Sequence, residues 1–327
     1  MRKIHNLCLI LMFLMLAAAS LSGCITINFP EQGEPAGVYP SPVMTPTATT
    51  IPATPVVQIP STAPPQPVSE LTDEVLLNGE YLSPVLQVPI RLVNGSFSGN
   101  AGGTQLEAIV TPEIQYGDLN GDSVDDAAFL LSENTGGSGI FVTLMVVFSV
   151  DGGFQQAPGV PVDDRPVLDG IIIDNGLVKL TGLVHAPNDP MVSPTTRMRA
   201  EYSLFGGQMV LTRYASAFGG GVEHSILIES PVDGTEVSGT LQLTGSMPIG
   251  PFENNLLLQI VDPVNRALIE EGFMVQAADM GAPATFEKTI SIPDVPTGQQ
   301  ILIVLSELSM ADGRPIAVDS VLVTVGQ

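Results

Sequence analysis

The stretch that decides the fold class of this chain is residues 140–150, IFVTLMVVFSV, a long apolar run. Residues 151–153, DGG, follow directly and end it. Glycine accepts the positive φ angles that tight turns need, so an apolar run that stops at such a sequence predicts a strand leading into a hairpin. The run therefore favours a mainly β fold.

The same kind of turn signal recurs on both sides of this run. Asn94-Gly95, Asn175-Gly176 and Gly206-Gly207 each separate two short apolar segments. Asn-Gly and Gly-Gly are typical of the two-residue turns that join antiparallel strands. We therefore expect residues 70–213 to form an antiparallel, β-rich domain.

One short helix is expected at the start of this domain. Thr72 can cap its first turn, in which Asp73 and Glu74 would interact favourably with the positive end of the helix dipole. The pattern predicts that the helix continues to about Leu82.

A second β domain is expected at residues 224–327, after a glycine-rich linker at 214–223. Its strand candidates are 225–229, 239–246, 255–262, 267–276, 284–292, 300–307 and 316–325. So many short strands in about 100 residues predict an immunoglobulin-like β-sandwich. The cysteine pair and the tryptophan of antibody domains are absent, so apolar burial alone must stabilise this sandwich.

The second domain also resembles the immunoglobulin-like domain found in bacterial spore germination proteins. The residues that carry the resemblance are Ile228-Glu229-Ser230-Pro231, Gly234, Val237, Gly245, Phe252-Glu253, Ser306-Glu307, Asp312-Gly313, Val321, Val323 and Val325. The resemblance implies an extracellular accessory or adhesion-type module, and it carries no catalytic residues over to this chain.

The N-terminus has the features of an export signal. Arg2 and Lys3 precede an apolar segment at 7–16, and the sequence LSGC follows at 21–24. This segment resembles the lipobox of bacterial lipoproteins. The resemblance implies removal of residues 1–23, covalent diacylglycerol on Cys24, and a lipid anchor at the extracytoplasmic face of the cell membrane. An ordinary signal peptide or an uncleaved anchor are the alternatives.

Residues 24–69 are expected to be a tether. Positions 25–69 hold 11 prolines and 7 threonines and no Lys or Arg. Proline removes backbone donors, and such a composition lacks core-forming side chains. The segment predicts an extended connection between the anchor and the folded domains.

Composition limits the classes of partner. The net charge of −23 repels phosphate backbones, so nucleic acid is excluded as an expected partner. Envelope glycans and envelope proteins remain possible partners. The chain has only 2 cysteines, Cys8 in the export signal and Cys24, so disulfides cannot hold the fold together.

The best candidate for chemistry is an acidic loop, GDLNGDSVDD, at 117–126. Its candidate metal ligands are Asp118, Asn120, Asp122, the carbonyl of Val124, and Asp126. Oxygen ligands at this spacing suit Ca²⁺. Ser123 stands where an EF-hand has Gly, and Phe129 stands where it has a bidentate Glu, so weak binding is expected. The alternative is a turn in which the side chains hydrogen-bond their own backbone.

Residues 71–213 also resemble a family of small bacterial lipoproteins of unknown activity, the LppP/LprE type. The resemblance rests on the acidic loop and on GGSG at 136–139, Asp189-Pro190 and Pro194-Thr195. It implies an exported, β-rich protein and assigns no reaction.

Catalytic constellations find little support. A site formed by Ser138, His185 and Asp189 is conceivable, but no motif spacing favours it. The neighbouring acids Asp163-Asp164 are expected to be solvated, because adjacent residues of a strand point to opposite faces.

These observations predict a non-enzymatic, membrane-anchored, extracytoplasmic lipoprotein that acts as a binding or accessory module of the cell envelope. Two alternatives remain. The protein could be a metal-dependent envelope hydrolase that uses the acidic loop, or an inhibitor of lytic enzymes.

Overall fold

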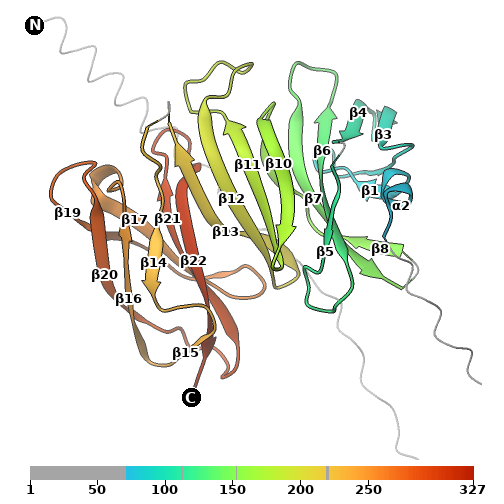
Figure 1. Cartoon of the computed structure of the whole chain (residues 1–327). Coiled ribbons are helices and arrows are strands. Elements are labelled where there is room, and N and C mark those ends of the chain that lie inside the picture. Colours follow the sequence, from blue (N-terminus) through green and yellow to red (C-terminus); the bar gives the residue numbers. More distant parts are fainter. Residues whose placement is uncertain (1–70, 112, 152, 219–220) are drawn as a thin grey trace, which may run out of the picture. The chain divides into compact units, whose positions relative to one another are not determined.

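In the part of the chain that it describes, the computed structural model consists mainly of β-strands. The structure describes residues 71–327 except 112, 152, 219 and 220 (Figure 1). The predicted signal peptide, the lipidation site at Cys24 and the tether lie outside the described residues. Among those described, no helix is long and apolar enough to cross a membrane.

We call residues 71–217 the N-terminal half and residues 224–327 the C-terminal half of the described chain. The N-terminal half begins with a short helix, a small hairpin and a seven-stranded sheet. The sheet order is β3-β4-β6-β7-β8, with β5 also paired to β6 and β9 also paired to β7. The bounds are α2 Asp73–Leu77, β1 Glu80–Leu82, β2 Pro89–Arg91, β3 Ser96–Ala101, β4 Thr104–Val110, β5 Gln115–Gly117, β6 Asp126–Asn134, β7 Phe141–Val150, β8 Gly153–Gln156 and β9 Val160–Asp164.

The apolar run at 140–150 forms β7 from Phe141 onward. Both β7 and its neighbour β6 are buried on both faces. Phe129 and Met145 face a core that includes α2 and the β1–β2 hairpin. Leu130 and Leu144 face a second core, shared with β11 (Leu177–Val184) and β12 (Thr196–Phe205). Burial on both faces explains why β7 is continuously apolar rather than alternating.

The helix is shorter than the sequence predicts. Thr72 caps it as expected, since its Oγ1 accepts a hydrogen bond from the Val75 N–H at 3.4 Å. The helix ends at Leu77, where the Asn78 side chain donates to the Glu74 carbonyl at 2.9 Å. The prediction of a helix to about Leu82 is wrong, because residues 80–82 pair with β2 and bury Tyr81 in the core.

A nine-stranded sheet runs from the N-terminal half into the C-terminal half. Its order is β10-β11-β12-β13-β22-β21-β17-β18, with β15 also paired to β22. The bounds are β10 Val167–Asp174, β11 Leu177–Val184, β12 Thr196–Phe205, β13 Gln208–Ala217, β15 Thr235–Val237, β17 Asn255–Val261, β18 Ala267–Met274, β21 Gln300–Leu308 and β22 Pro315–Val325.

Two of the predicted hairpins are confirmed at their turns, whereas the strands on either side of Asn94-Gly95 lie in different sheets and are linked there only by the isolated bridge between Val93 and Ser96. Asn175 and Gly176 have φ of 52° and 74° and join β10 to β11. Gly206 and Gly207 have φ of 60° and 84° and join β12 to β13. Positive φ at both central positions is what the right-handed twist of the paired strands requires.

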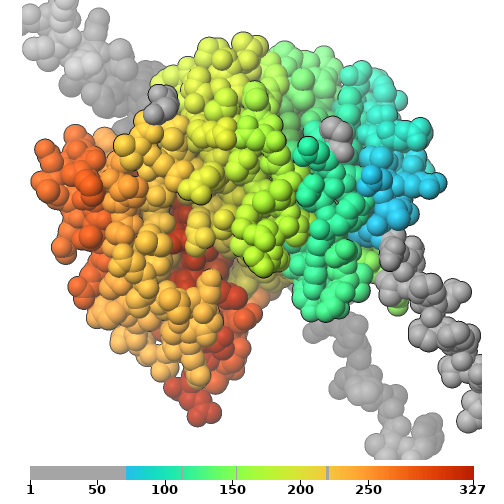
Figure 2. Space-filling model, in the orientation of Figure 1, coloured from blue at the N-terminus to red at the C-terminus, as the bar shows by residue number. Residues whose placement is uncertain are grey.

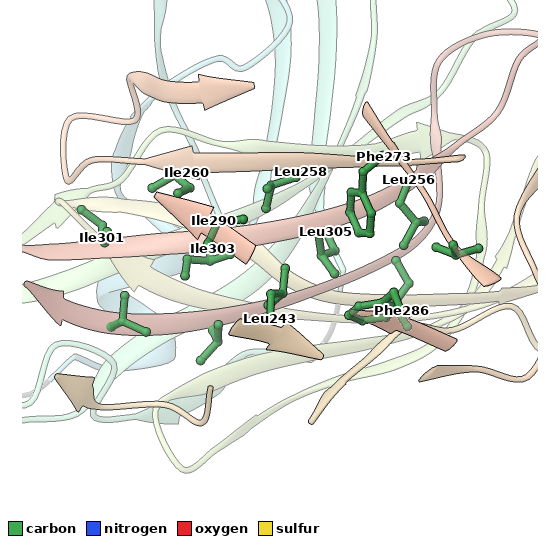
Figure 3. Close-up of a cluster of buried hydrophobic side chains, with 14 of the residues drawn as sticks. Leu243, Leu256, Leu258, Ile260, Phe273, Phe286, Ile290, Ile301, Ile303 and Leu305 are labelled. Carbon is green, nitrogen blue, oxygen red and sulfur yellow. The ribbon is translucent and has the colours of Figure 1, made fainter. Parts of the chain in front are cut away.

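A four-stranded sheet completes the C-terminal sandwich, in the order β14-β16-β20-β19. Its bounds are β14 Leu227–Ser230, β16 Thr240–Met247, β19 Gln276–Ala277 and β20 Ala284–Ser291. Figure 3 shows its core, in which Leu243, Phe286 and Ile290 meet Leu258 and Ile303 from the facing sheet. The mainly β fold and the immunoglobulin-like sandwich are confirmed. Strands β15 and β19 are additional to the seven predicted.

The two halves are joined by strand pairing. Arg213 and Tyr214 of β13 pair with Asp319 and Val318 of β22. Residues 214–217, which the sequence places in a linker, are thus part of a strand, because β22 offers them a pairing edge that local sequence does not reveal. Figure 2 shows the surfaces of the two halves meeting.

Side chains reinforce this junction. The buried carboxylate of Asp319 accepts hydrogen bonds from Arg213 Nε at 3.1 Å and from the Ile228 N–H at 2.8 Å. Phe205 packs with Val261 and Leu302 in a small core of its own. Next to this core, the Cα of Gly206 approaches Pro263 so closely that an added Cβ would lie 1.4 Å from the Pro263 carbonyl oxygen.

This contact predicts different costs for two neighbouring substitutions. Gly207→Ala should lower the free energy of unfolding by about 1–2 kcal/mol, because alanine is strained at positive φ and nothing else lies within reach. Gly206→Ala adds a clash with the Pro263 backbone and should cost about 3 kcal/mol or more. Urea unfolding followed by circular dichroism measures both, and equal costs would contradict the close docking of this turn.

Candidate functional site

The predicted metal ligands lie together in the loop between β5 and β6. Asp118 accepts hydrogen bonds from the Gly121 N–H at 2.6 Å and from the Ser123 N–H at 2.9 Å. These bonds lower the pKa of Asp118, the Ser123 bond most. Ser123 has φ of 67°, which explains why related loops place glycine there.

The remaining ligands are also engaged within the protein. Asn120 Oδ1 accepts from the Asp122 N–H at 2.9 Å, and Asp122 Oδ1 accepts from the Val124 N–H at 2.8 Å. These contacts are those of an Asx-type turn.

Asp126 anchors the loop to the sheet. Its side chain is fully buried, and its two oxygens accept from the N–H groups of Leu119 and Ser149, each at 3.0 Å. Burial is the largest effect on this carboxyl and raises its pKa, against the lowering effect of the two bonds.

The loop therefore folds by its own hydrogen bonds, as the Asx-turn alternative predicts. Among the described residues, no group of three or more His, Cys, Asp or Glu is arranged to hold a metal ion. Asp126, with both oxygens directed to backbone N–H groups, does not fit a ligand role in this conformation. Calcium binding stays a prediction for this loop.

A large cavity in the part of the chain that the structure describes lies elsewhere, next to the junction of the two halves. It has a volume of about 970 Å³, within the range of sites for small molecules. Its walls come from β7, β9, β11, β12 and β13, and residues 308–316 of the β21–β22 turn close one side. Val142, Met198 and Tyr202 line it while also belonging to the core between the sheets.

A polar cluster stands in this apolar surrounding. Asp163 Oδ2 accepts from the His185 N–H at 2.7 Å and lies 2.9 Å from His185 Nδ1. Asp163 Oδ1 accepts from Arg314 Nη1 at 3.1 Å. The Asp163 side chain is 2% exposed, so the expectation that it is solvated is wrong. The residues that satisfy it come from a loop and a turn far along the chain.

Asp164 also lines the cavity, but its hydrogen-bond partners differ from those of Asp163. It accepts from the Ile140 N–H at 2.8 Å and from Arg165 Nε at 3.0 Å. Its partial burial works against ionisation, but these bonds prevail and lower its pKa.

Two buried polar atoms of the cavity have no hydrogen-bond partner. They are His185 Nε2 and Thr196 Oγ1, and their residues are 9% and 3% exposed. An unsatisfied buried polar group costs about 1–3 kcal/mol. Buried polar groups in native folds are nearly always hydrogen-bonded, so both atoms are candidate contacts for a molecule in the cavity.

The mouth of the cavity carries exposed apolar side chains, which we call the apolar rim. Its members are Val85, Phe141, Phe218, Phe252, Leu308 and Met310. Exposed apolar residues that line a hollow are typical of a binding surface.

Tyr214 also lines the cavity. Burial and the negative charge of Asp163 raise the pKa of Tyr214 to about 12, so its phenol stays neutral at physiological pH. The cavity wall thus offers hydrogen-bonding groups without adding charge.

The conceivable Ser138–His185–Asp189 site is not assembled. Asp189 accepts hydrogen bonds from Ala186 and Thr195 and so caps its own loop, while His185 pairs with Asp163. Ser138 does not line the cavity.

The Asp163–His185–Arg314 cluster was not predicted from the sequence. The only sequence signal was a lone histidine after an apolar strand, which is too common to indicate a site.

Comparison with known proteins identifies the C-terminal half. Residues 225–314 match the family described as the immunoglobulin-like domain of bacterial spore germination. This part of the chain is a domain of that type, which confirms the resemblance seen in the sequence. Neither the curated proteins nor the solved structures compared with this chain include a match.

The acidic loop generates a calcium prediction. Titration calorimetry of the protein with Ca²⁺ should show weak binding, with a dissociation constant of about 10⁻⁴–10⁻³ M, because the bidentate Glu is missing and Asp126 is engaged. Asp122→Ala should abolish the binding. Asp125→Ala, which alters an exposed acid of the same loop, should leave it unchanged. Absence of binding at several times the upper concentration would refute a calcium site.

The unpartnered hydroxyl of Thr196 generates a stability prediction. Thr196→Val should raise the free energy of unfolding of the ligand-free protein by about 1 kcal/mol, because it removes an unsatisfied polar group at equal volume. Ser216→Ala should lower it by about 1 kcal/mol, because Ser216 Oγ donates to the Ile316 carbonyl at 2.7 Å. Urea unfolding measures both, and a loss of stability in Thr196→Val would show that this hydroxyl is satisfied.

Proposed function

We propose that this protein is a non-enzymatic, lipid-anchored binding protein at the extracytoplasmic face of the cell membrane, where it serves as an accessory module of the envelope. The observation that carries the proposal is the cavity of about 970 Å³, with its apolar walls and two unpartnered polar atoms. Concave, mainly apolar sites with a few placed polar groups are the usual form of ligand sites.

The contents of the cavity favour binding over catalysis. His185 is oriented by Asp163 as a general base would be, yet its free Nε2 has no hydrogen-bonded hydroxyl or thiol among the described residues. Nucleophilic catalysis needs such a group within reach of the base.

The acidic loop gives the hydrolase alternative no support. None of its residues lines the cavity, and the carboxylates of Asp118, Asp122 and Asp126 accept hydrogen bonds from backbone N–H groups. Inhibition of lytic enzymes is a form of the same binding function with a protein partner.

The proposed location rests on the sequence before the described residues. The lipobox-like LSGC at 21–24 would place diacylglycerol on Cys24. Two acyl chains give stable anchoring where a single chain is marginal. The proline-rich residues 25–69 would then separate the folded unit from the membrane surface.

The charge of the protein restricts its partners. With a net charge of −23, the protein repels nucleic acids and anionic surfaces, which leaves neutral glycans, proteins and uncharged small molecules of the envelope.

The two cysteines allow a matched test of the anchor. Cys24→Ala should move the protein from the membrane fraction to the soluble fraction of cells and abolish incorporation of labelled palmitate, because the acceptor thiol is lost. Cys8→Ala, which changes the cysteine within the export signal, should leave both unchanged. Membrane association and labelling that persist in Cys24→Ala would sink the proposed anchor.

A further inference from the structure

The walls of the cavity favour an apolar ligand. Most of the lining side chains are aliphatic or aromatic, and the apolar rim continues them to the surface. A ligand that enters would remove this apolar surface from water, and the gain in binding grows with the apolar area that is buried.

The charges in the cavity argue against an ionic head group. Arg314 is paired with Asp163 and also contacts Asp312 at 3.5 Å, so its charge is matched within the wall. Asp163 accepts three hydrogen bonds from its neighbours and is likewise satisfied. The acids of the lining outnumber its one arginine, which disfavours an anion further.

The unpartnered atoms define the head group instead. The carboxylate of Asp163 favours a proton on His185 Nδ1, and in the tautomer with the proton there, Nε2 is an acceptor. Thr196 Oγ1 can donate or accept. An uncharged hydroxyl group of a ligand can donate a hydrogen bond to His185 Nε2 and accept one from Thr196 Oγ1.

We propose that this cavity binds a lipid-like molecule, an apolar chain that ends in an uncharged, hydroxyl-bearing head held by His185 and Thr196. The inference rests on the proposed binding function and names its ligand class. Two sources could supply the apolar chain, a separate neutral lipid of the envelope or the acyl groups attached to Cys24. The hydroxyl requirement favours the separate lipid.

Calorimetry with simple amphiphiles tests the proposal. The protein carries Cys24→Ala, so that no attached acyl group can occupy the cavity, and is freed of bound lipid before titration. Affinity should rise about 4-fold per methylene from 1-octanol to 1-decanol, as burial of the chain requires. Decanoate and decyltrimethylammonium should bind at least 10-fold more weakly than 1-decanol.

Variants separate the head-group contacts from the chain contacts. Thr196→Val and His185→Phe should each weaken 1-decanol about 2- to 10-fold, the range expected for one lost hydrogen bond, without changing the dependence on chain length. Ser149→Ala is the matched control, because Ser149 Oγ is also buried and unpartnered but does not line the cavity. It should bind as the parent does.

The outcomes are distinct. Affinity that does not depend on chain length overturns the apolar-chain assignment, and decanoate that binds as tightly as 1-decanol overturns the uncharged head. If the acylated protein with Cys24 intact binds no 1-decanol, its own acyl groups fill the cavity and the separate lipid is overturned. Failure of every amphiphile overturns this inference, whereas the lipid anchor is tested separately by the fractionation of Cys24→Ala.

Discussion

The pairing of β13 with β22 is the contact on which the rest of this structure depends. Two residue pairs, Arg213 with Asp319 and Tyr214 with Val318, turn the strands of both halves into one sheet. Because β22 follows the turn that contains Arg314, fixing β22 also fixes that turn beside β9. Arg314 can then reach Asp163, which lies 151 positions earlier in the chain. Without the shared sheet, the cavity would lack the wall formed by residues 308–316.

The cavity combines features that cost stability with features that support it. Asp163 and Arg314 satisfy each other, whereas His185 Nε2 and Thr196 Oγ1 stay without partners in an apolar setting. An apolar substitution at Thr196 would pack equally well, so folding alone does not explain a threonine there. Sites that sacrifice stability in this way are typically functional. The proposed binding function accounts for this geometry, since a bound ligand would supply the missing hydrogen bonds.

Turns, the helix cap and most strands could be predicted from the sequence, because interactions between residues close in the chain determine them. The hairpins at Asn175-Gly176 and Gly206-Gly207, the Thr72 cap and the strands of the C-terminal sandwich follow from turn chemistry and apolar patterning. The length of the helix did not, because pairing of β1 with β2 overrides helix propensity after Leu77. The cavity could not be predicted at all. Its polar cluster joins Asp163, His185 and Arg314 from separate elements, and no spacing in the sequence records that they meet.

Buried carboxylates connect segments that are distant in the chain, as disulfides do in other small domains. Asp126 connects the acidic loop to β7, and Glu133 on β6 holds the turn after β1 by accepting from Ser83 Oγ at 2.5 Å and from the Val85 N–H at 3.1 Å. Asp319 does the same between β22 and β14. Burial is the largest effect on all three and raises their pKa values. The fold tolerates this cost because each carboxylate satisfies backbone N–H groups that would otherwise be buried without partners. The need to satisfy these backbone N–H groups explains why a chain with few charged residues has several acids in its core. Each of these acids lies where two distant segments share one hydrogen-bond acceptor.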